Sequence, residues 1–149
     1  MLSNELKSKI NKLWDKFWSR GITNPITAIE QISYLLFMRR IDDADALDKA
    51  KAIFAEQEYK SIFEGNEECR WSHFSQPSID PDTKLKLVSE KAFNFIKNLN
   101  DPSQPYTRHM QNAQFIINNA ALLDEAIKAI DEIFEDIKKL KMNSKQITL

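Results

Sequence analysis

The chain has 149 residues, of which 42% are hydrophobic and 29% charged, a composition typical of one globular domain and unlike that of a disordered chain. Its two glycines are too few for a β-rich fold with many tight turns or for a glycine-rich phosphate-binding loop, and its net charge of −1 gives no overall positive field for nucleic acid. The single cysteine excludes an intramolecular disulfide, and the sequence shows neither a signal-peptide pattern nor an apolar run long enough for a bilayer, which predicts a cytoplasmic protein without membrane contact.

Helical periodicity dominates the chain and predicts an all-α fold, a compact bundle of about five helices joined by irregular loops. The first helix is expected over residues 2–19, with Gly21 as the residue that ends it. Its apolar face is expected to hold Leu6, Ile10, Leu13, Trp14 and Phe17. We interpret the aromatic residues Trp14, Phe17 and Trp18 as core packing and not as a platform for base stacking.

The second helix is expected to begin at Asn24-Pro25, where asparagine caps the helix and proline takes the first helical position. Its main apolar face is expected to hold Ile26, Ile29, Ile32, Leu36 and Ile41. Further apolar residues cover much of its remaining surface, so this helix is predicted to be the central helix of the core. After Asp42 the chain turns charged, and residues 44–54 either continue this helix or begin another.

In the second half, residues 64–80 are expected to be irregular and held to the helices by Trp71 and Phe74. A helix is predicted from Asp80-Pro81 to about Leu99, then a proline-containing loop, a helical turn over residues 107–112 and a brief extended piece over residues 115–117. The last helix is predicted from near Asn119, with its carboxylates mostly on a solvated face. The predicted domain spans residues 1–141, and residues 142–149 are expected to be a frayed tail or the start of a linker.

No catalytic or metal site is predicted. Cys69 and His73 are four residues apart, but a structural zinc site normally has four ligands, and only His109 remains among these residue types. Serines are present, yet no local pattern marks one as activated by a histidine and an acid.

The candidates for contact with DNA or a protein partner are basic side chains, namely Lys9, Lys12, Lys16, Arg20, Arg39, Arg40 and Arg108. The first four fall in one narrow sector of the first helix, where they either follow a phosphate backbone or form an ordinary solvated face. Arg39 and Arg40 follow the apolar run at the expected end of the second helix, where they either pair with nearby aspartates or contact a partner. Arg108 lies beside His109, just after the proline loop.

Three stretches, in the same order, resemble one known family. They are residues 13–43, residues 70–74 with the sequence Arg-Trp-Ser-His-Phe, and residues 106–117, which continue into Ala121-Leu122-Leu123 and the last helix. Together they resemble the opening of the modification (methyltransferase) subunits of type I DNA restriction-modification systems. Several ordered matches over most of the chain are much more specific than any single motif.

The resemblance implies a helical domain that precedes an adenine N6-methyltransferase domain. In that family two modification subunits join one specificity subunit, sometimes with a restriction subunit, and the helical domain is implicated in subunit contacts and in closing the complex around double-stranded DNA. The resemblance therefore implies the specificity subunit, a second modification subunit and duplex DNA as partners.

The family's cofactor chemistry does not map onto this chain. Its cradle for S-adenosylmethionine is glycine-rich and follows a strand, and its base clamp has an Asn-Pro-Pro-aromatic pattern, whereas Asn24-Pro25 here continues with Ile26-Thr27. We expect no cofactor in this chain and expect S-adenosylmethionine to belong to a catalytic domain that is absent from it. The chain stops about where the family's linker begins, so we expect an expressed fragment or a truncated gene product.

The leading hypothesis is thus a non-catalytic N-terminal domain of a type I modification subunit, which serves subunit assembly and enclosure of DNA. The main alternative is a free-standing helical protein-interaction module or regulator, which the near-neutral charge favours. A small enzyme with an unrecognised site among the carboxylates is the third hypothesis.

Overall fold

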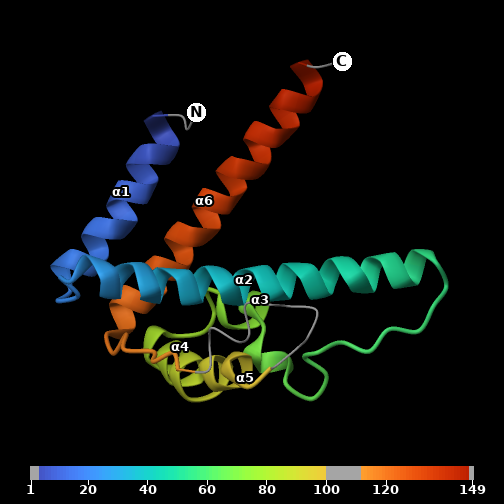
Figure 1. Ribbon diagram of the computed structural model, residues 1–149, viewed down its shortest axis with the longest axis horizontal. Coiled ribbons are helices and arrows are strands. Elements are labelled where there is room, and N and C mark those ends of the chain that lie inside the picture. The colour runs from blue at the N-terminus through green and yellow to red at the C-terminus, as the bar shows by residue number, and fades with distance from the viewer. Residues whose placement is uncertain (1–3, 100–111, 148–149) are drawn as a thin grey trace.

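The computed structural model describes residues 4–99 and 112–147, with side chains up to residue 141. These residues form helices joined by turns and loops, with no strand among them, which confirms the predicted all-α fold. The long helix α2 (Pro25–Phe54) crosses the middle of the molecule. Helix α1 (Asn4–Ser19) and the C-terminal part of helix α6 (Ala120–Ile147) extend from one side of α2, and the short helices between residues 67 and 97 lie on the opposite side (Figure 1).

The turn between α1 and α2 follows the sequence signals. Gly21 has a φ of 98°, the left-handed conformation that ends a helix, and the N–H of Ile22 donates to the carbonyl of Phe17 at 3.0 Å. The side-chain oxygen of Asn24 then accepts hydrogen bonds from the N–H groups of Ile26 at 2.9 Å and Thr27 at 3.4 Å. The turn therefore has its capping bonds made by its own residues.

The buried face of α2 differs from the predicted one. Ile26 and Ile29 are 68% and 54% exposed, and Leu36 is only partly buried. Ile41 is buried as predicted, but the rest of the buried stripe mixes apolar and polar side chains: Ala28, Gln31, Leu35, Met38, Arg39, Asp42 and Asp45. The prediction chose the more apolar side of the helix, and it was wrong because the polar residues of the other side find partners inside the protein.

Gln31 shows how a polar residue fits this interior. Its side-chain amide donates to the carbonyl of Gln114 at 3.0 Å, and its side-chain oxygen accepts from the N–H of Ile116 at 3.0 Å. The segment 113–119 contains neither helix nor strand, so its backbone groups have no ladder of their own. Gln31 therefore anchors this segment to α2, beside the buried residues Ala113 and Ile117.

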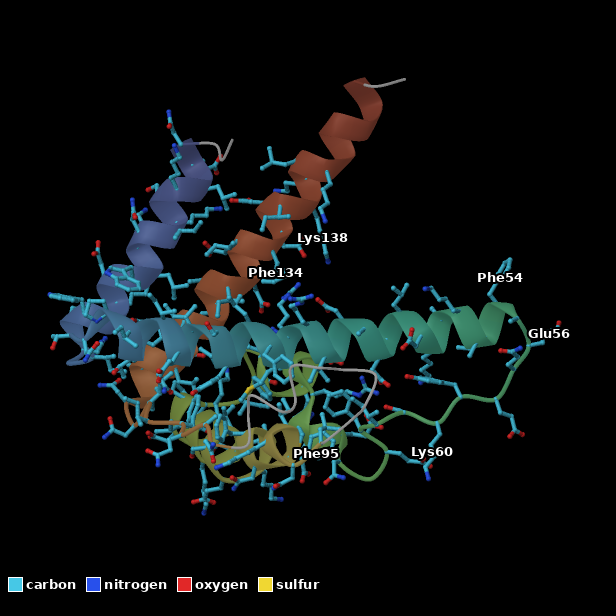
Figure 2. The ribbon with its side chains drawn as sticks, in the orientation of Figure 1. Phe54, Glu56, Lys60, Phe95, Phe134 and Lys138 are labelled. Atoms are coloured by element: carbon cyan, nitrogen blue, oxygen red, sulfur yellow. The ribbon has the colours of Figure 1, made fainter. Side chains whose placement is uncertain are left out.

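Helix α2 continues without a break through the charged residues after Asp42, so residues 44–54 belong to it. Beyond its last turn, Glu56 has a φ of 56° and the N–H of Gln57 donates to the carbonyl of Ala52 at 2.8 Å. This is the left-handed ending that glycine usually provides. Figure 2 shows Phe54 and Glu56 at the far tip of α2.

Residues 64–80 contain a 3₁₀ turn (η1, Glu67–Cys69) and one short helix (α3, Trp71–Phe74). Trp71 and Phe74 are buried in the core, which confirms that they hold this segment to the helices. Their rings also contact each other edge to face, with centroids 5.4 Å apart.

The helix predicted from Asp80 begins as expected but does not run unbroken to Leu99. The side chain of Asp80 accepts from the N–H of Thr83 at 3.0 Å and caps α4 (Pro81–Leu87). A π-helical turn (η2, Val88–Ala92) then leads into α5 (Phe93–Lys97). The buried residues of this part are Lys84, Val88, Ala92, Phe93 and Ile96.

Helix α6 begins where the sequence predicts, because the side-chain oxygen of Asn119 accepts from the N–H of Leu122 at 2.9 Å. Its N-terminal half carries the buried face, formed by Leu122, Leu123, Ala126, Ile127 and Ile130. The helix continues to Ile147, into the residues 142–149 that were predicted as a frayed tail or the start of a linker. The helical turn predicted for residues 107–112 lies, apart from Asn112, outside the described residues.

A buried ion pair joins α4 to α6. The side chain of Lys84 is fully buried, and its Nζ lies 2.7 Å from Oδ1 of Asp124. Burial alone would raise the pKa of the Asp124 carboxyl, but hydrogen bonds from Lys84 and Lys128 outweigh burial and hold the pKa below its ordinary value. Such a pair fixes the register of two elements, because leaving either charge alone in the interior is costly.

The corrected face of α2 makes a prediction about stability. Leu35→Ala should lower the free energy of unfolding by about 2–5 kcal/mol, because Leu35 is fully buried, whereas Leu36→Ala should lower it less. Leu47→Ala, at an exposed position of the same helix, serves as the control and should change it by less than about 0.5 kcal/mol. Urea denaturation of the three variants measures the difference, and equal losses at Leu35 and Leu36 would contradict this burial pattern.

Candidate functional site

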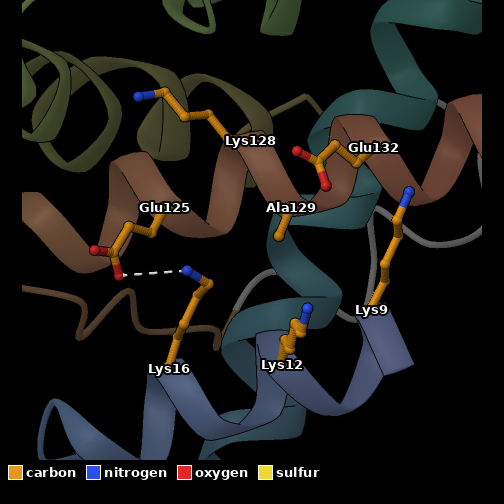
Figure 3. Close-up of a pocket in the computed structure, with 7 residues that line it drawn as sticks. All are labelled: Lys9, Lys12, Lys16, Glu125, Lys128, Ala129 and Glu132. Carbon is orange, nitrogen blue, oxygen red and sulfur yellow. Dashed lines mark ion pairs between the residues drawn. The ribbon is translucent and has the colours of Figure 1, made fainter. Parts of the chain in front are cut away.

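The lysine row predicted on α1 faces α6 (Figure 3). Lys9 Nζ lies 2.7 Å from Oδ2 of Asp136, and this hydrogen bond raises the pKa of Lys9. Lys16 and Arg20 approach Glu125 at 3.9 and 3.3 Å. Three of the four cations therefore pair with carboxylates of α6, and contact of this row with DNA or a partner stays a prediction.

Between the two helices lies a shallow cavity of about 260 Å³. Its lining residues are Lys9, Lys12, Lys16, Glu125, Lys128, Ala129 and Glu132. Lys12 is exposed and makes no ion pair with any residue that the structure describes. Four lysines and two glutamates line the cavity, so the lining carries an excess of positive charge, and the ion pairs of Lys9 and Lys16 to α6 help to hold the two helices together.

The carboxylates of α6 also depart from their predicted role. They were expected on a solvated face, yet Asp124, Asp131 and Asp136 each bind a cation of another helix. The sequence of α6 alone does not show these ion pairs, because the basic partners of its carboxylates lie on helices that are distant in the sequence.

Arg39 was predicted either to contact a partner or to pair with nearby aspartates, and the structure shows it paired. It lies in the middle of α2, because the helix continues past it, and its side chain is buried. Its guanidinium binds Asp131 of α6, approaches Asp43 at 3.6 Å and lies 4.5 Å from the ring centroid of Phe134. Trp71 donates from its ring nitrogen to the same Asp131 oxygen at 2.8 Å. Arg39 thus links α2 to α6 and α3.

Arg40 differs from its neighbour Arg39, because its side chain on α2 is exposed. It therefore stays a candidate for contact with a partner. Arg108 lies outside the described residues.

The structure assigns a central position to Arg70, which the sequence analysis did not single out as a site residue. Its guanidinium binds Asp42 at 2.7 Å, Asp45 at 2.6 Å and Glu67 at 2.6 Å. It also lies 4.6 Å from the ring centroid of Phe63. The signal that would have found it is the pair of aspartates three residues apart on one face of α2, which need a cation if that face is buried.

Asp45 is the most enclosed carboxylate of this cluster. Tyr59 and Ser61 donate their hydroxyl hydrogens to it at 2.6 and 2.7 Å. Burial alone would raise the pKa of the Asp45 carboxyl, but the hydrogen bonds from Tyr59, Ser61 and Arg70 hold the pKa below its ordinary value. Burial, followed by the hydrogen bond to Asp45 and its charge, raises the pKa of Tyr59 to about 12.

The remaining candidates show no reactive arrangement. Cys69 is buried, and burial raises the pKa of its thiol, which disfavours the nucleophilic thiolate. The described residues contain no group of three or more His, Cys, Asp and Glu side chains that could hold a metal ion. Of the aromatic cluster on α1, Phe17 is buried and Trp14 partly buried as predicted, but Trp18 is exposed and does not pack in the core.

Within residues 4–99 and 112–147, no helix is both long and apolar enough to cross a membrane.

Comparison with protein families gives the identity of the domain. The family model described as the HsdM N-terminal domain matches residues 6–130, which hold α1, α2, the short helices and the buried half of α6. The chain belongs to the HsdM N-terminal domain family. This is the N-terminal domain of the modification subunit of type I restriction-modification systems, so the resemblance drawn from the sequence is confirmed. Comparisons with curated proteins and with solved structures found no match.

The positions of Arg39 and Arg40 in this HsdM N-terminal domain predict different mutational effects. Arg39→Ala should lower the free energy of unfolding by roughly 2–3 kcal/mol, less than for a fully buried pair because Asp131 is partly exposed. Arg40→Ala, at the next and exposed position, should cost less than about 1 kcal/mol. Thermal or urea unfolding of the two variants tests this, and an Arg39→Ala variant as stable as the unaltered domain would show that the buried pair is not needed.

The Asp45 cluster predicts a titration at high pH. The pKa of Tyr59 is about 12 in the folded domain and about 10 when unfolded, so this hydroxyl contributes stability that is fully present below about pH 10 and is lost as the pH rises to 12. The phenolate absorbance that Tyr59→Phe removes should therefore appear near pH 12. Asp45→Asn should move it to lower pH, and a Tyr59 that titrates near 10 in the unaltered domain would contradict the hydrogen bond.

Proposed function

We propose that the chain is the non-catalytic N-terminal domain of a type I DNA adenine N6-methyltransferase modification subunit, and that it serves subunit assembly and enclosure of DNA. The observation that carries this proposal is the family match over residues 6–130, which includes every buried apolar residue that the structure describes. Its partners are the specificity subunit, a second modification subunit and, in the assembled complex, double-stranded DNA. The complex works in the cytoplasm.

The positions of the two glycines support the non-catalytic character of the chain. Both glycines of the sequence lie at turns of the chain with positive φ, 98° at Gly21 and 81° at Gly65. Neither belongs to a glycine-rich segment that follows a strand, which is the pattern of a cofactor cradle. S-adenosylmethionine is accordingly proposed to bind a separate methyltransferase domain, and no step of methyl transfer is assigned to residues of this chain.

Two features of the surface support a role in assembly: basic side chains that are paired within the domain, and apolar side chains that are exposed. Lys9, Lys16 and Arg20 pair with carboxylates of α6, while the C-terminal end of α2 exposes the large apolar side chains Leu47, Ile53 and Phe54. Exposed apolar surface is typical of protein contacts, and the paired cations limit how strongly the isolated domain can attract phosphate.

Deletion of this domain from its modification subunit provides the test. The truncated subunit, assembled with the specificity subunit, should still bind S-adenosylmethionine but should release duplex DNA about tenfold or more faster, because a complex that cannot close loses its partner through a higher dissociation rate. Surface plasmon resonance on immobilised duplex measures the release, and equilibrium dialysis measures the cofactor.

Two results would overturn the proposal. Saturable binding of S-adenosylmethionine by the 149-residue chain alone would give the domain a catalytic role. Failure of the complete modification subunit to join the specificity subunit would instead favour the free-standing interaction module.

A further inference from the structure

The cavity between α1 and α6 is lined almost entirely by charged side chains (Figure 3). We call it the α1–α6 cleft, with the lining residues Lys9, Lys12, Lys16, Glu125, Lys128, Ala129 and Glu132. Ala129 is the one apolar residue among these seven. The centre of a protein–protein interface is depleted of charged residues, whereas protein–DNA interfaces are polar and positively charged. The composition of the cleft therefore favours DNA over a second protein as its occupant.

The charge of the cleft has the sign that DNA requires. Four lysines and two glutamates give the lining a net charge of +2. The count can be extended to the carboxylates that pair with these lysines and to the other cations that bind those carboxylates. It then comprises six cations and five carboxylates, because it adds Glu5, Arg20, Lys84, Asp124 and Asp136. The cleft therefore stays cationic after its ion pairs are counted, although the chain as a whole has a net charge of −1.

Lys128 can leave its ion pair at little cost. Its side chain is 60% exposed, and its Nζ lies 2.9 Å from Oδ2 of Asp124. The other oxygen of Asp124 binds the buried Lys84 at 2.7 Å. Asp124 therefore keeps a cation if Lys128 turns to another anion, and an exposed ion pair contributes little to stability.

Lys12 and Lys16 are available in a similar way. Lys12 is exposed and makes no ion pair with any residue in the described part of the chain. Lys16 lies 3.9 Å from Glu125, and Arg20 approaches the same carboxylate more closely, at 3.3 Å. If Lys16 turns away, Glu125 therefore stays paired. Three lysines of the cleft can bind an added anion without leaving a carboxylate alone.

These three lysines lie away from the carboxylate that would oppose an anion most. Figure 3 shows Glu132 near Lys9 at one end of the cleft, and Lys16 and Lys128 at the other end. Lys12 comes between Lys9 and Lys16 along α1, on the same side of the helix. The geometry thus leaves room for one anionic group between α1 and α6, at the end opposite Glu132.

We propose that the α1–α6 cleft holds one backbone phosphate of the enclosed double-stranded DNA, bound by Lys12, Lys16 and Lys128. This inference rests on the proposed function, since it names the group through which the domain contacts the duplex. A phosphate contact positions DNA and carries no sequence information, so it leaves recognition of the DNA sequence to other parts of the complex. The contact is limited to one phosphate because Lys9 remains bound to Asp136.

The first experiment measures how the affinity of the complete complex for duplex DNA depends on salt. Lys12→Gln with Lys128→Gln removes two of the three proposed phosphate ligands. The slope of log affinity against log salt concentration should become shallower by about 0.9, the value for one neutralised phosphate on a duplex. Affinity near 0.1 M salt should fall about fivefold to tenfold, and by the same factor for duplexes with and without the recognised sequence.

Two control variants show whether the effect belongs to the cleft. Lys7→Gln with Lys138→Gln removes the same charge from exposed positions of the same two helices, outside the cleft lining. Lys12→Arg with Lys128→Arg keeps the charge in the cleft. Both controls should retain the salt slope of the unaltered complex, and unfolding curves establish that every variant is folded. A slope that the cleft variant leaves unchanged, or that the outside pair lowers equally, would overturn the proposal.

The second experiment identifies the occupant in the unaltered complex. An amine-acetylating reagent is applied with and without duplex DNA, and modification of each lysine is measured by mass spectrometry. Lys12 and Lys128 should be protected severalfold when DNA is bound, whereas Lys7 and Lys138 should not change. Protection that is complete on subunit assembly, before DNA is added, would show that a protein group occupies the cleft and would overturn the proposal. Absence of protection by DNA would overturn it as well.

The two proposals fail in different ways. If the complex that lacks this domain releases duplex DNA no faster than the complete complex, the proposed function is wrong. If deletion of the domain speeds release, but Lys12→Gln with Lys128→Gln leaves the salt slope unchanged, only the phosphate site in the α1–α6 cleft is wrong.

Discussion

The guanidinium of Arg70 is the cation that binds two carboxylates, Asp42 and Asp45, that α2 places in the interior of the domain. A buried carboxylate is strongly unfavourable unless a cation and hydrogen-bond donors compensate for its lost hydration. Arg70 comes from the turn before α3, so this compensation also determines where the segment with Trp71 lies against α2. The loop after α2 is anchored in the same way, because Tyr59 donates to Asp45. One cationic group therefore supports the middle of the long helix, the packing of α3 and the return of the chain after α2.

The same arrangement recurs where α6 meets the other helices. Asp131 accepts hydrogen bonds from Arg39 of α2 and Trp71 of α3, and Asp124 binds the buried Lys84 of α4. Apolar packing alone is tolerant of small rotations and shifts between helices, whereas each of these bonds is satisfied in one register only. We infer that the charge pairs contribute more to the uniqueness of the helix arrangement than to its net stability, since the desolvation of both partners offsets much of their attraction.

How far the sequence predicts this structure depends on whether a signal is local. The cap at Asn24 and the left-handed Gly21 are local, and both were predicted. The start of the last helix near Asn119 was also predicted, although the capping bond of Asn119 was not. The buried face of α2 was not predicted correctly. Asp42 and Asp45 can be buried only because they bind Arg70, which is distant in sequence. The π-helical turn after α4 likewise has no marker in composition. For the candidate site, the basic residues on α1 were named from the sequence, but the carboxylates of α6 that pair with them were not.

The internal pairing of charge also bears on how such a domain would help to enclose DNA. A row of four free cations would add salt-dependent affinity for phosphate, yet three of the four on α1 are matched by carboxylates of α6, and the chain carries a net charge of −1. Under the proposed function, the domain is therefore better suited to completing a protein ring than to gripping the duplex. A ring that closes through protein contacts retains DNA by topology and leaves sequence recognition unaffected.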